Sequence, residues 1–292
     1  PPYYSAVYPE HKYNFFLYYK GDAEEYAPEQ RTQGSITKFF RIDGTQDLIS
    51  AYARPGTEDA ERLPDNDETK YLMNHAGDLV YSTKSARLRV EPHLRVKHEL
   101  AQVNFKVQAF DDLAAQGREI RIQAVALVIP TKAQFTVAAD WAGVSHDWTD
   151  ETNVPPTGIV WETERDTVYL PHENTPEEFG STYQMENAMF NPEPGVSDPK
   201  AEPMKIGTQL LVPPVDEMGV IIHYRLITTR PDDLIPSGSL FTARYANLHF
   251  EGGFQAGKQH EVLLKVYGPQ RVDLEIDGLP GWIDGGDVEI PE

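Results

Sequence analysis

The side chains that most often perform acid–base chemistry are present in this chain, but they are not grouped. His172 and Glu173 precede the neighbouring carboxylates Glu177 and Glu178 in a proline-containing segment. Paired carboxylates hydrolyse glycosides only when a cleft holds them at a fixed separation. Nothing in this spacing fixes such a separation, so we predict that the chain is not an enzyme.

Motifs that hold metals, phosphates or nucleophiles are also missing from the sequence. It contains no glycine-rich phosphate loop, no GxSxG and no HExxH. The absence of cysteine excludes thiol catalysis, disulfides and zinc–thiolate sites. The acidic run 65–68 (DNDE) lacks the spacing and the glycine of an EF-hand calcium loop. We therefore predict no cofactor and no metal site.

Two residues that lie in alternating apolar series are predicted to have a structural role. His98 alternates with Val96 and Leu100, so its side chain is expected to point into a core. A lone histidine without partners at ligand spacing is more often bonded to a backbone carbonyl or a neighbouring strand than to a metal. Phe105 continues the apolar series after His98 and is assigned to the same core.

Trp282 leaves two interpretations open. It follows a proline turn after the last strong strand pattern. It either plugs the core of the C-terminal half or forms an exposed platform on which a sugar stacks. The apolar neighbours Leu279 and Ile283 favour the plug.

Composition narrows the class of protein further. The 292 residues are 40% hydrophobic and 25% charged, which is typical of globular proteins. The formal net charge of −20 disfavours nucleic acid and anionic membranes as partners. No run of about 20 apolar residues is present that could span a bilayer. The chain begins at Pro1 without methionine, so we expect a processed or trimmed product.

Period-2 patterns separated by turn residues predict many strands and little helix. Short helices are expected only at Asp111–Gln116 and Pro176–Tyr183. The expected strands are Tyr13–Tyr19, Ser35–Ile42, Asp47–Ala53, Arg95–Val107, Glu119–Ile129, Lys205–Val212, Val220–Thr229, Leu240–Phe250, His260–Tyr267 and Val272–Ile276.

The phase of one apolar series changes within a strand. Leu94 to Leu100 are apolar at even positions, whereas Ala101 to Val107 are apolar at odd positions. One extra residue produces this change, so we predict a β-bulge at Leu100–Ala101.

These patterns predict an all-β fold of two antiparallel β-sandwich domains. We place the N-terminal domain at residues 1–150 and the C-terminal domain at 151–292, with the boundary in the polar stretch Ala142–Pro156. The proline-rich segment Asn187–Pro203 is predicted to be a long surface loop of the second domain.

Several segments, in this order, resemble the fimbrillin family of Bacteroidales-type bacteria. Residues 78–107 (DLVYSTKSARLRVEPHLRVKHELAQVNFKV) are similar to a pattern of the family's N-domain, including H-x-L-A-x-V-x-F-x-V from His98 to Val107. Upstream, residues 47–55 (DLISAYARP) resemble the preceding strand. In the C-terminal part, residues 210–214 (LLVPP), 254–268 (FQAGKQHEVLLKVYG) and the Gly281-Trp282 pair resemble later motifs, with His260 where tyrosine is usual.

The resemblance implies a specific fold, cellular location and mode of assembly. It implies two domains of transthyretin-like build, export as a lipoprotein to the cell surface and the outer membrane, and proteolytic trimming there. It also implies head-to-tail assembly with other fimbrial subunits by strand exchange, and adhesion to host or bacterial surface ligands or glycans.

The processing site and the C-terminal tail follow from these expectations. The segment after Tyr19 (GDAEEYAPEQR) is predicted to be an acidic loop, and its flanking residues Lys20 and Arg31 are the candidate cleavage sites. Val288 and Ile290 alternate with acidic residues, so we predict a strand at 287–292 that closes the second domain of its own chain.

Three functional hypotheses remain. The first is a structural or accessory subunit of a fimbrium. The second is a surface glycan-binding lipoprotein that does not polymerise, and the third, for which no catalytic constellation exists, is a β-sandwich hydrolase.

Overall fold

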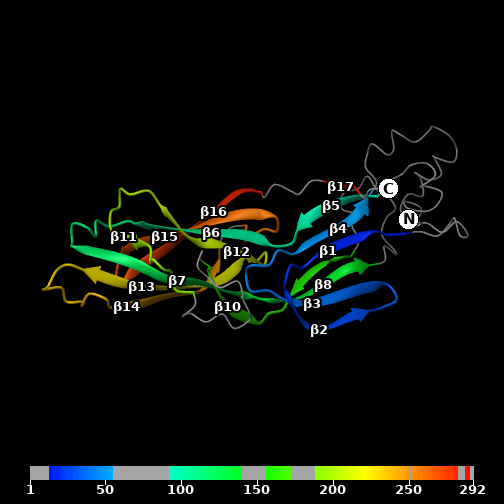
Figure 1. Ribbon diagram of the computed structural model, residues 1–292, viewed down its shortest axis with the longest axis horizontal. Helices are drawn as coiled ribbons and strands as arrows, with labels where there is room; N and C mark the ends of the chain where they lie inside the picture. The colour runs from blue at the N-terminus through cyan, green and yellow to red at the C-terminus, as the bar shows by residue number, and fades with distance from the viewer. Residues whose placement is uncertain are drawn as a thin grey trace, which may run out of the picture.

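The computed structural model describes residues 13–54, 92–139, 156–171, 188–249, 252–281 and 287–289. Within these ranges the regular structure consists of strands, and no helix is present. The prediction of an all-β protein is therefore confirmed. Figure 1 shows an elongated arrangement of four sheets, two in each half of the molecule.

One half of the molecule, called the first half below, contains sheets A and B. In sheet A the strand order is β1-β4-β5-β17, and in sheet B it is β2-β3-β8-β9. The strands of sheet A are β1 (Phe16–Tyr19), β4 (Ile49–Arg54), β5 (His93–His98) and β17 (Asp287–Glu289). Those of sheet B are β2 (Glu24–Arg31), β3 (Ser35–Arg41), β8 (Lys132–Ala139) and β9 (Gly158–Trp161).

The second half contains sheets C and D. In sheet C the order is β12-β6-β15-β16, and in sheet D it is β10-β7-β13-β14, with β11 also paired to β7. The strands of sheet C are β6 (Ala101–Ala109), β12 (Met204–Val212), β15 (Lys258–Gly268) and β16 (Arg271–Gly281). Those of sheet D are β7 (Arg118–Pro130), β10 (Arg165–Tyr169), β11 (Gly195–Val196), β13 (Glu217–Thr228) and β14 (Leu240–His249).

Three chain crossings connect the halves within the described ranges. The chain passes from β5 in sheet A to β6 in sheet C through Glu99 and Leu100, and from β7 in sheet D to β8 in sheet B through Thr131. It then returns from β9 in sheet B to β10 in sheet D through residues 162–164, and β17 of sheet A follows β16 of sheet C along the chain. The predicted bulge at Leu100–Ala101 is thus a change of sheet. A change of sheet produces the same phase change in the apolar pattern as a bulge does, because the two strands turn their apolar residues toward different cores.

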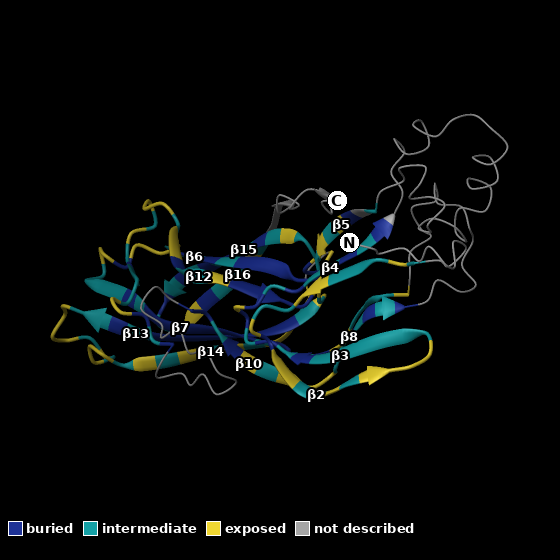
Figure 2. Cartoon of the chain, turned by 45° about the vertical axis from the view of Figure 1, so that its right-hand side comes forward, coloured by how far each residue is buried: buried dark blue, intermediate teal, exposed yellow. Residues whose placement is uncertain are grey.

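The largest hydrophobic cluster lies between sheets C and D. Val103 and Phe105 of β6 contribute to it from one sheet, and Leu127 of β7 and Ile222 of β13 contribute from the other. A second cluster, with Phe40 and Phe135, joins sheet B to the crossing residue Leu100. Figure 2 shows the buried residues concentrated along the strands that run between the halves.

Strand direction and pairing differ in part from the sequence-based expectation. The hairpin of β15 and β16 across Gly268–Gln270 is antiparallel as expected, whereas β15 and β6 are parallel. About 150 residues separate β6 from β15, so no short connection dictates their direction. Because β6 and β7 pair with strands of residues 204–281, the sheets extend across residue 150. The boundary stretch lies outside the described residues up to residue 155, so the two-domain division stays a prediction.

Three local predictions are corrected, and a fourth is not tested. Residues 111–116 form hydrogen-bonded turns, not a helix, and their amide groups bond to one another and to Ser197. The segment 24–31 is strand β2, because it pairs with β3. The described part of Asn187–Pro203 is packed, with Phe190 in the core. The predicted helix at 176–183 lies outside the described residues.

The C-terminal tail joins the first half of the molecule. β17 pairs antiparallel with β5, with Val288 opposite Leu94. The prediction that this tail closes the second domain is therefore wrong. Alternating apolar residues select a strand, but they do not specify which sheet it joins.

Phe105 provides a test of the core. Its side chain is fully buried, and it lies between Ile206 of β12 and Val262 of β15. We expect Phe105→Ala to lower the free energy of unfolding by about 3–5 kcal/mol, because the substitution leaves a cavity. Denaturant titration measures this, with Asn104→Ala on the opposite face as a control expected to change stability by less than about 1 kcal/mol. Equal effects of the two substitutions would contradict this core assignment.

Candidate functional site: strand edges and the β12 cleft

The described residues contain no group of three or more His, Asp or Glu side chains that could hold a metal ion. No helix in the described ranges is long and apolar enough to cross a membrane. The features suited to binding another molecule are instead the edges of sheet A and a cleft beside β12.

Both edge strands of sheet A come from the outer parts of the sequence. β1 borders the sheet on one side and β17 on the other, with β4 and β5 between them. β1 is joined to β4 by four register pairs, and β17 is joined to β5 by three. Figure 1 shows β1 and β17 in the same half of the molecule.

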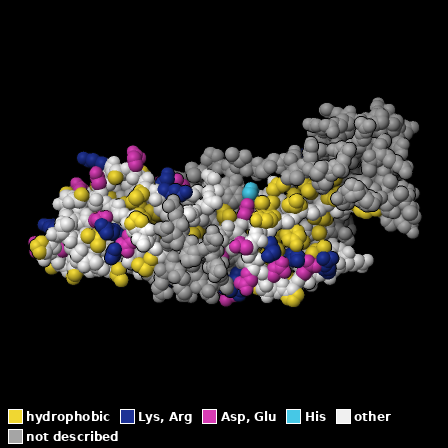
Figure 3. Space-filling view, in the orientation of Figure 1, with side chains coloured by type: hydrophobic (Ala, Val, Ile, Leu, Met, Phe, Trp, Pro, Cys, Tyr) yellow, Lys and Arg dark blue, Asp and Glu magenta, His cyan; other side chains and the backbone are white. Residues whose placement is uncertain are grey.

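β1 is only partly covered. Tyr18 and Tyr19 are 40% and 55% exposed. The ring of Tyr18 meets Phe135 of sheet B edge-on at a centroid distance of 6.4 Å, and the N–H of Ala53 donates to the carbonyl of Phe15 at 2.8 Å. In Figure 3 hydrophobic side chains gather over this region. β1 therefore makes specific contacts without being a core strand.

The two candidate cleavage residues lie in different surroundings. Lys20 donates from Nζ to the carbonyl of Ala23 at 2.8 Å, and its ammonium lies 6.0 Å from the Phe40 ring centre. Arg31 ends β2, and its side chain is 70% exposed and paired with Glu29. Arg31 is thus the more accessible of the two, and their processing role stays a prediction.

The predicted structural residues are placed as follows. Phe105 lies in the main core. Nδ1 of His98 is 2.8 Å from the Asp47 carboxylate, and 17% of the His98 side chain is exposed. One partner of His98 is therefore a carboxylate that precedes β4. Trp282 lies outside the described residues.

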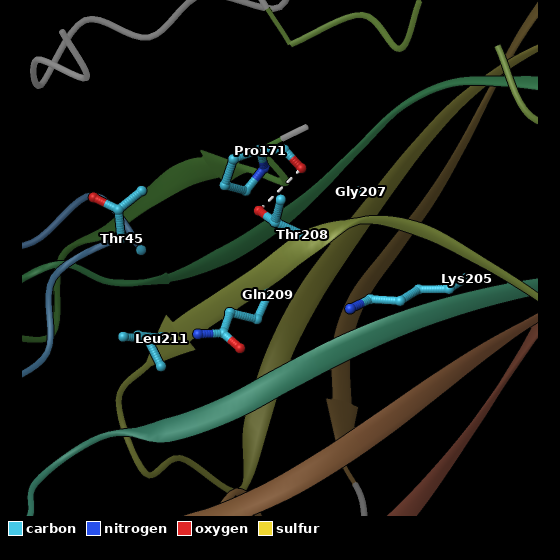
Figure 4. A pocket seen from close by; sticks show the side chains of 8 residues that line it. Thr45, Pro171, Lys205, Gly207, Thr208, Gln209 and Leu211 are labelled. Atoms are coloured by element: carbon cyan, nitrogen blue, oxygen red, sulfur yellow. Dashed lines mark hydrogen bonds between the residues drawn. The ribbon is translucent and has the colours of Figure 1, made fainter. Parts of the chain in front are cut away.

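A cleft of about 600 Å³ opens where the ladder between β12 and β6 is interrupted (Figure 4). Ile206 and Leu210 pair with β6, whereas residues 207–209 bulge out of register. The N–H of Thr208 donates to the carbonyl of Pro171 at 2.8 Å. The cleft is lined by Gly44, Thr45, Pro171, Lys205, Gly207, Thr208, Gln209 and Leu211.

Gly207 makes the bulge possible. Its φ of +61° is a left-handed conformation, and a Cβ here would lie 2.6 Å from Cγ of Leu170 and 2.7 Å from the carbonyl oxygen of Pro171. Sequence reasoning did not identify this cleft. The available signal was a glycine inside the strand pattern Lys205–Val212, which often marks a bulge.

Three glutamine side chains form a chain of hydrogen bonds across sheet C next to the cleft. Gln259 donates from Nε2 to Oε1 of Gln102 at 3.1 Å, and Gln102 donates to Oε1 of Gln209. The donor amide of Gln209 is thus at the end of the chain, on the side of the cleft (Figure 4).

His260 fixes the loop that follows residue 252. Its Nε2 accepts the N–H of Gln255 at 3.1 Å, so the ring is neutral in this arrangement. Burial lowers the pKa of His260, and nearby Lys258 lowers it further. Burial, with Arg244 second, also lowers the pKa of His223. The folded state therefore favours the neutral form of both histidines.

Comparison with known proteins finds solved structures that are similar to this chain at low sequence identity. No protein-family model matches the chain, and no curated protein matches it. A fimbrial protein from Bacteroides vulgatus aligns with 87% of this chain and 70% of its own, at 14% identity and a TM-score of 0.44. A candidate cell adhesion protein from Bacteroides uniformis aligns with 96% and 94%, at 10% identity and a TM-score of 0.33. Another candidate cell adhesion protein, from Bacteroides eggerthii, aligns with 92% of this chain and 88% of its own, at 9% identity and a TM-score of 0.34.

Substitution of Gly207 tests the bulge. Gly207→Ala should lower the free energy of unfolding by more than about 2 kcal/mol, because left-handed strain and the contact with Pro171 add together. Gly238→Ala is the control, since Gly238 has φ +88° but open space around it. Thermal melting of the two variants should show the larger loss for Gly207→Ala, and an equal loss would contradict the close contact.

The pH dependence of stability tests His260. Its folded-state pKa lies below the unfolded value, so the unfolded chain takes up the proton first as the pH falls. The stability contribution is complete above about pH 6.5 and is lost as the pH falls toward the folded-state value. His260→Gln should make the decline in stability between about pH 7 and 5 shallower in denaturant titrations. An unchanged slope would show that His260 is not the group that titrates.

Proposed function

We propose that this chain is a subunit of a cell-surface fimbrium that assembles by strand exchange and serves adhesion. In this proposal it is exported as a lipoprotein, its partners are other fimbrial subunits arranged head to tail, and it has no catalytic role. The four sheets form two β-sandwiches of transthyretin-like build, A with B and C with D. The ordered motifs in the sequence and the cluster between sheets C and D support this build.

The observation that carries the proposal is the composition of sheet A. Its outer strands, β1 and β17, come from residues 16–19 and from residues 287–289. An edge strand can leave its sheet without interrupting the pairs between the remaining strands. The remaining edge then presents unpaired backbone groups, which a strand from another molecule can satisfy.

The two edges differ in what their loss requires. Release of β1 frees the edge of β4 at residues 49–52. β17 is held by three register pairs, and a backbone hydrogen bond adds only about 1 kcal/mol net. The tail is therefore weakly held in its own chain and is suited to be donated. Donation from each subunit to the next is a heterologous contact that produces a filament.

Cleavage at Arg31 would act on two sheets at once. Residues before the cut include β1, the edge of sheet A, and β2, the edge of sheet B. Cleavage at Lys20 would separate β1 alone. Because Arg31 is exposed at the end of a strand and Lys20 is tied to Ala23, we favour Arg31 as the processing site.

Limited trypsin digestion followed by assembly tests this function. We expect early cleavage after Arg31, detected by mass spectrometry, while the released peptide stays bound through its strand pairs. After mild urea removes that peptide, the trimmed chain should form linear oligomers in size-exclusion chromatography and electron microscopy. The untrimmed chain should stay monomeric.

Two variants are the controls. The double variant Lys20→Gln, Arg31→Gln should resist this cleavage and remain monomeric under the same treatment. A chain that lacks residues 287–292 should be trimmed normally but fail to extend oligomers. If the trimmed, peptide-free chain folds yet stays monomeric at high concentration, strand exchange through sheet A is wrong.

A further inference from the structure

The cleft beside β12 contains a lysine that no acidic side chain in the described ranges neutralises. Lys205 is exposed and lines the cleft, and Figure 4 shows its side chain extending toward Gln209. Most other described lysines and arginines of the strands have carboxylate partners, for example Lys38 with Glu29 and Lys132 with Glu164. An unneutralised cation is notable in a chain of formal net charge −20.

The position of Lys205 in the sheet is also locally unfavourable. It lies directly opposite Lys106 of β6, and like charges at opposite positions of neighbouring strands repel. Lys106 is compensated by Glu261 on its other side, at 2.8 Å. Lys205 has no corresponding carboxylate on β12, so an anion in the cleft would supply the missing charge.

Gln209 supplies neutral donors to the same space. Its Oε1 is occupied by Gln102, whose own Oε1 is occupied by Gln259. This chain orients the amide nitrogen of Gln209 outward, and no described group accepts its N–H bonds. An ammonium and an amide nitrogen therefore line one cleft, and both are donors that a carboxylate accepts.

We propose that this cleft binds an acidic sugar, a uronic or sialic acid residue. Lys205 and Gln209 receive its carboxylate. Leu211 and Pro171 provide apolar surface for the ring, and the hydroxyl of Thr208 lies beside it. The volume of about 600 Å³ is in the range of small-ligand clefts.

The shape of β12 favours a compact ligand over an extended acidic peptide. β12 is an edge strand of sheet C, and an extended peptide would bind there by continuing the ladder. The bulge at residues 207–209 interrupts that edge, and the N–H of Thr208 is already bonded to Pro171. Bulges of this kind prevent continuous pairing along an edge.

Calorimetric or NMR titration of the full chain tests the site. The probes are methyl glycosides of glucuronic, galacturonic and N-acetylneuraminic acid, with methyl glucoside as the neutral match and hexaglutamate as the acidic peptide. At least one acidic glycoside should bind about tenfold more tightly than methyl glucoside, and more tightly than hexaglutamate. Lys205→Gln should weaken that binding about tenfold.

Lys200→Gln is the matched control, because Lys200 is an exposed lysine outside the cleft. It should leave the affinity unchanged, while Gln209→Leu should weaken binding with the fold kept intact, as circular dichroism would show. Failure of all three acidic glycosides to bind overturns the proposal. So does equal binding of the glucoside, tighter binding of hexaglutamate, or a Lys205→Gln variant that binds as well as the parent chain.

Discussion

The arrangement of the four sheets depends on the places where the chain passes from one half of the molecule to the other. Within the described ranges Glu99 and Leu100 connect sheet A to sheet C, Thr131 connects sheet D to sheet B, and residues 162–164 connect sheet B to sheet D. Each crossing is fixed by backbone bonds to other segments: Leu48 accepts from Glu99, Leu100 from Gly257, Thr131 from Ile42 and Lys132 from Glu162. Asp166 adds a side-chain link, because Thr131 and Arg41 both donate to its carboxylate, and the bond from Thr131 is the largest influence that lowers its pKa.

Much of this fold could be predicted from the sequence because alternating apolar residues are a local signal. Strands such as β6 and β15 satisfy that pattern almost residue by residue. β2 was missed because its EEYAPEQR segment is acidic and contains proline, which an edge strand tolerates. Which strands become neighbours is not local, so the parallel pair β6–β15 and the joining of β17 to β5 could not be read from periodicity.

The cleft illustrates the same limit for function. Gly207 is visible in the sequence as a glycine within a strand pattern. Gln102, Gln209 and Gln259, however, are separated by up to 157 residues, and only strand pairing brings them together. In the same way, the Asp47 carboxylate that contacts His98 lies 51 residues away in the sequence. The sequence shows which types of side chain are present, but strand pairing in the sheets determines which of them lie together.

The crossings have a mechanical consequence. Tension applied to the two ends of the molecule must be transmitted from one half to the other. Covalent backbone joins the halves at β5–β6, at β7–β8 and at β9–β10, in addition to the packed side chains. The halves therefore cannot separate unless strands next to these connections leave their sheets. Resistance to shear is thereby built into the order of the strands along the chain.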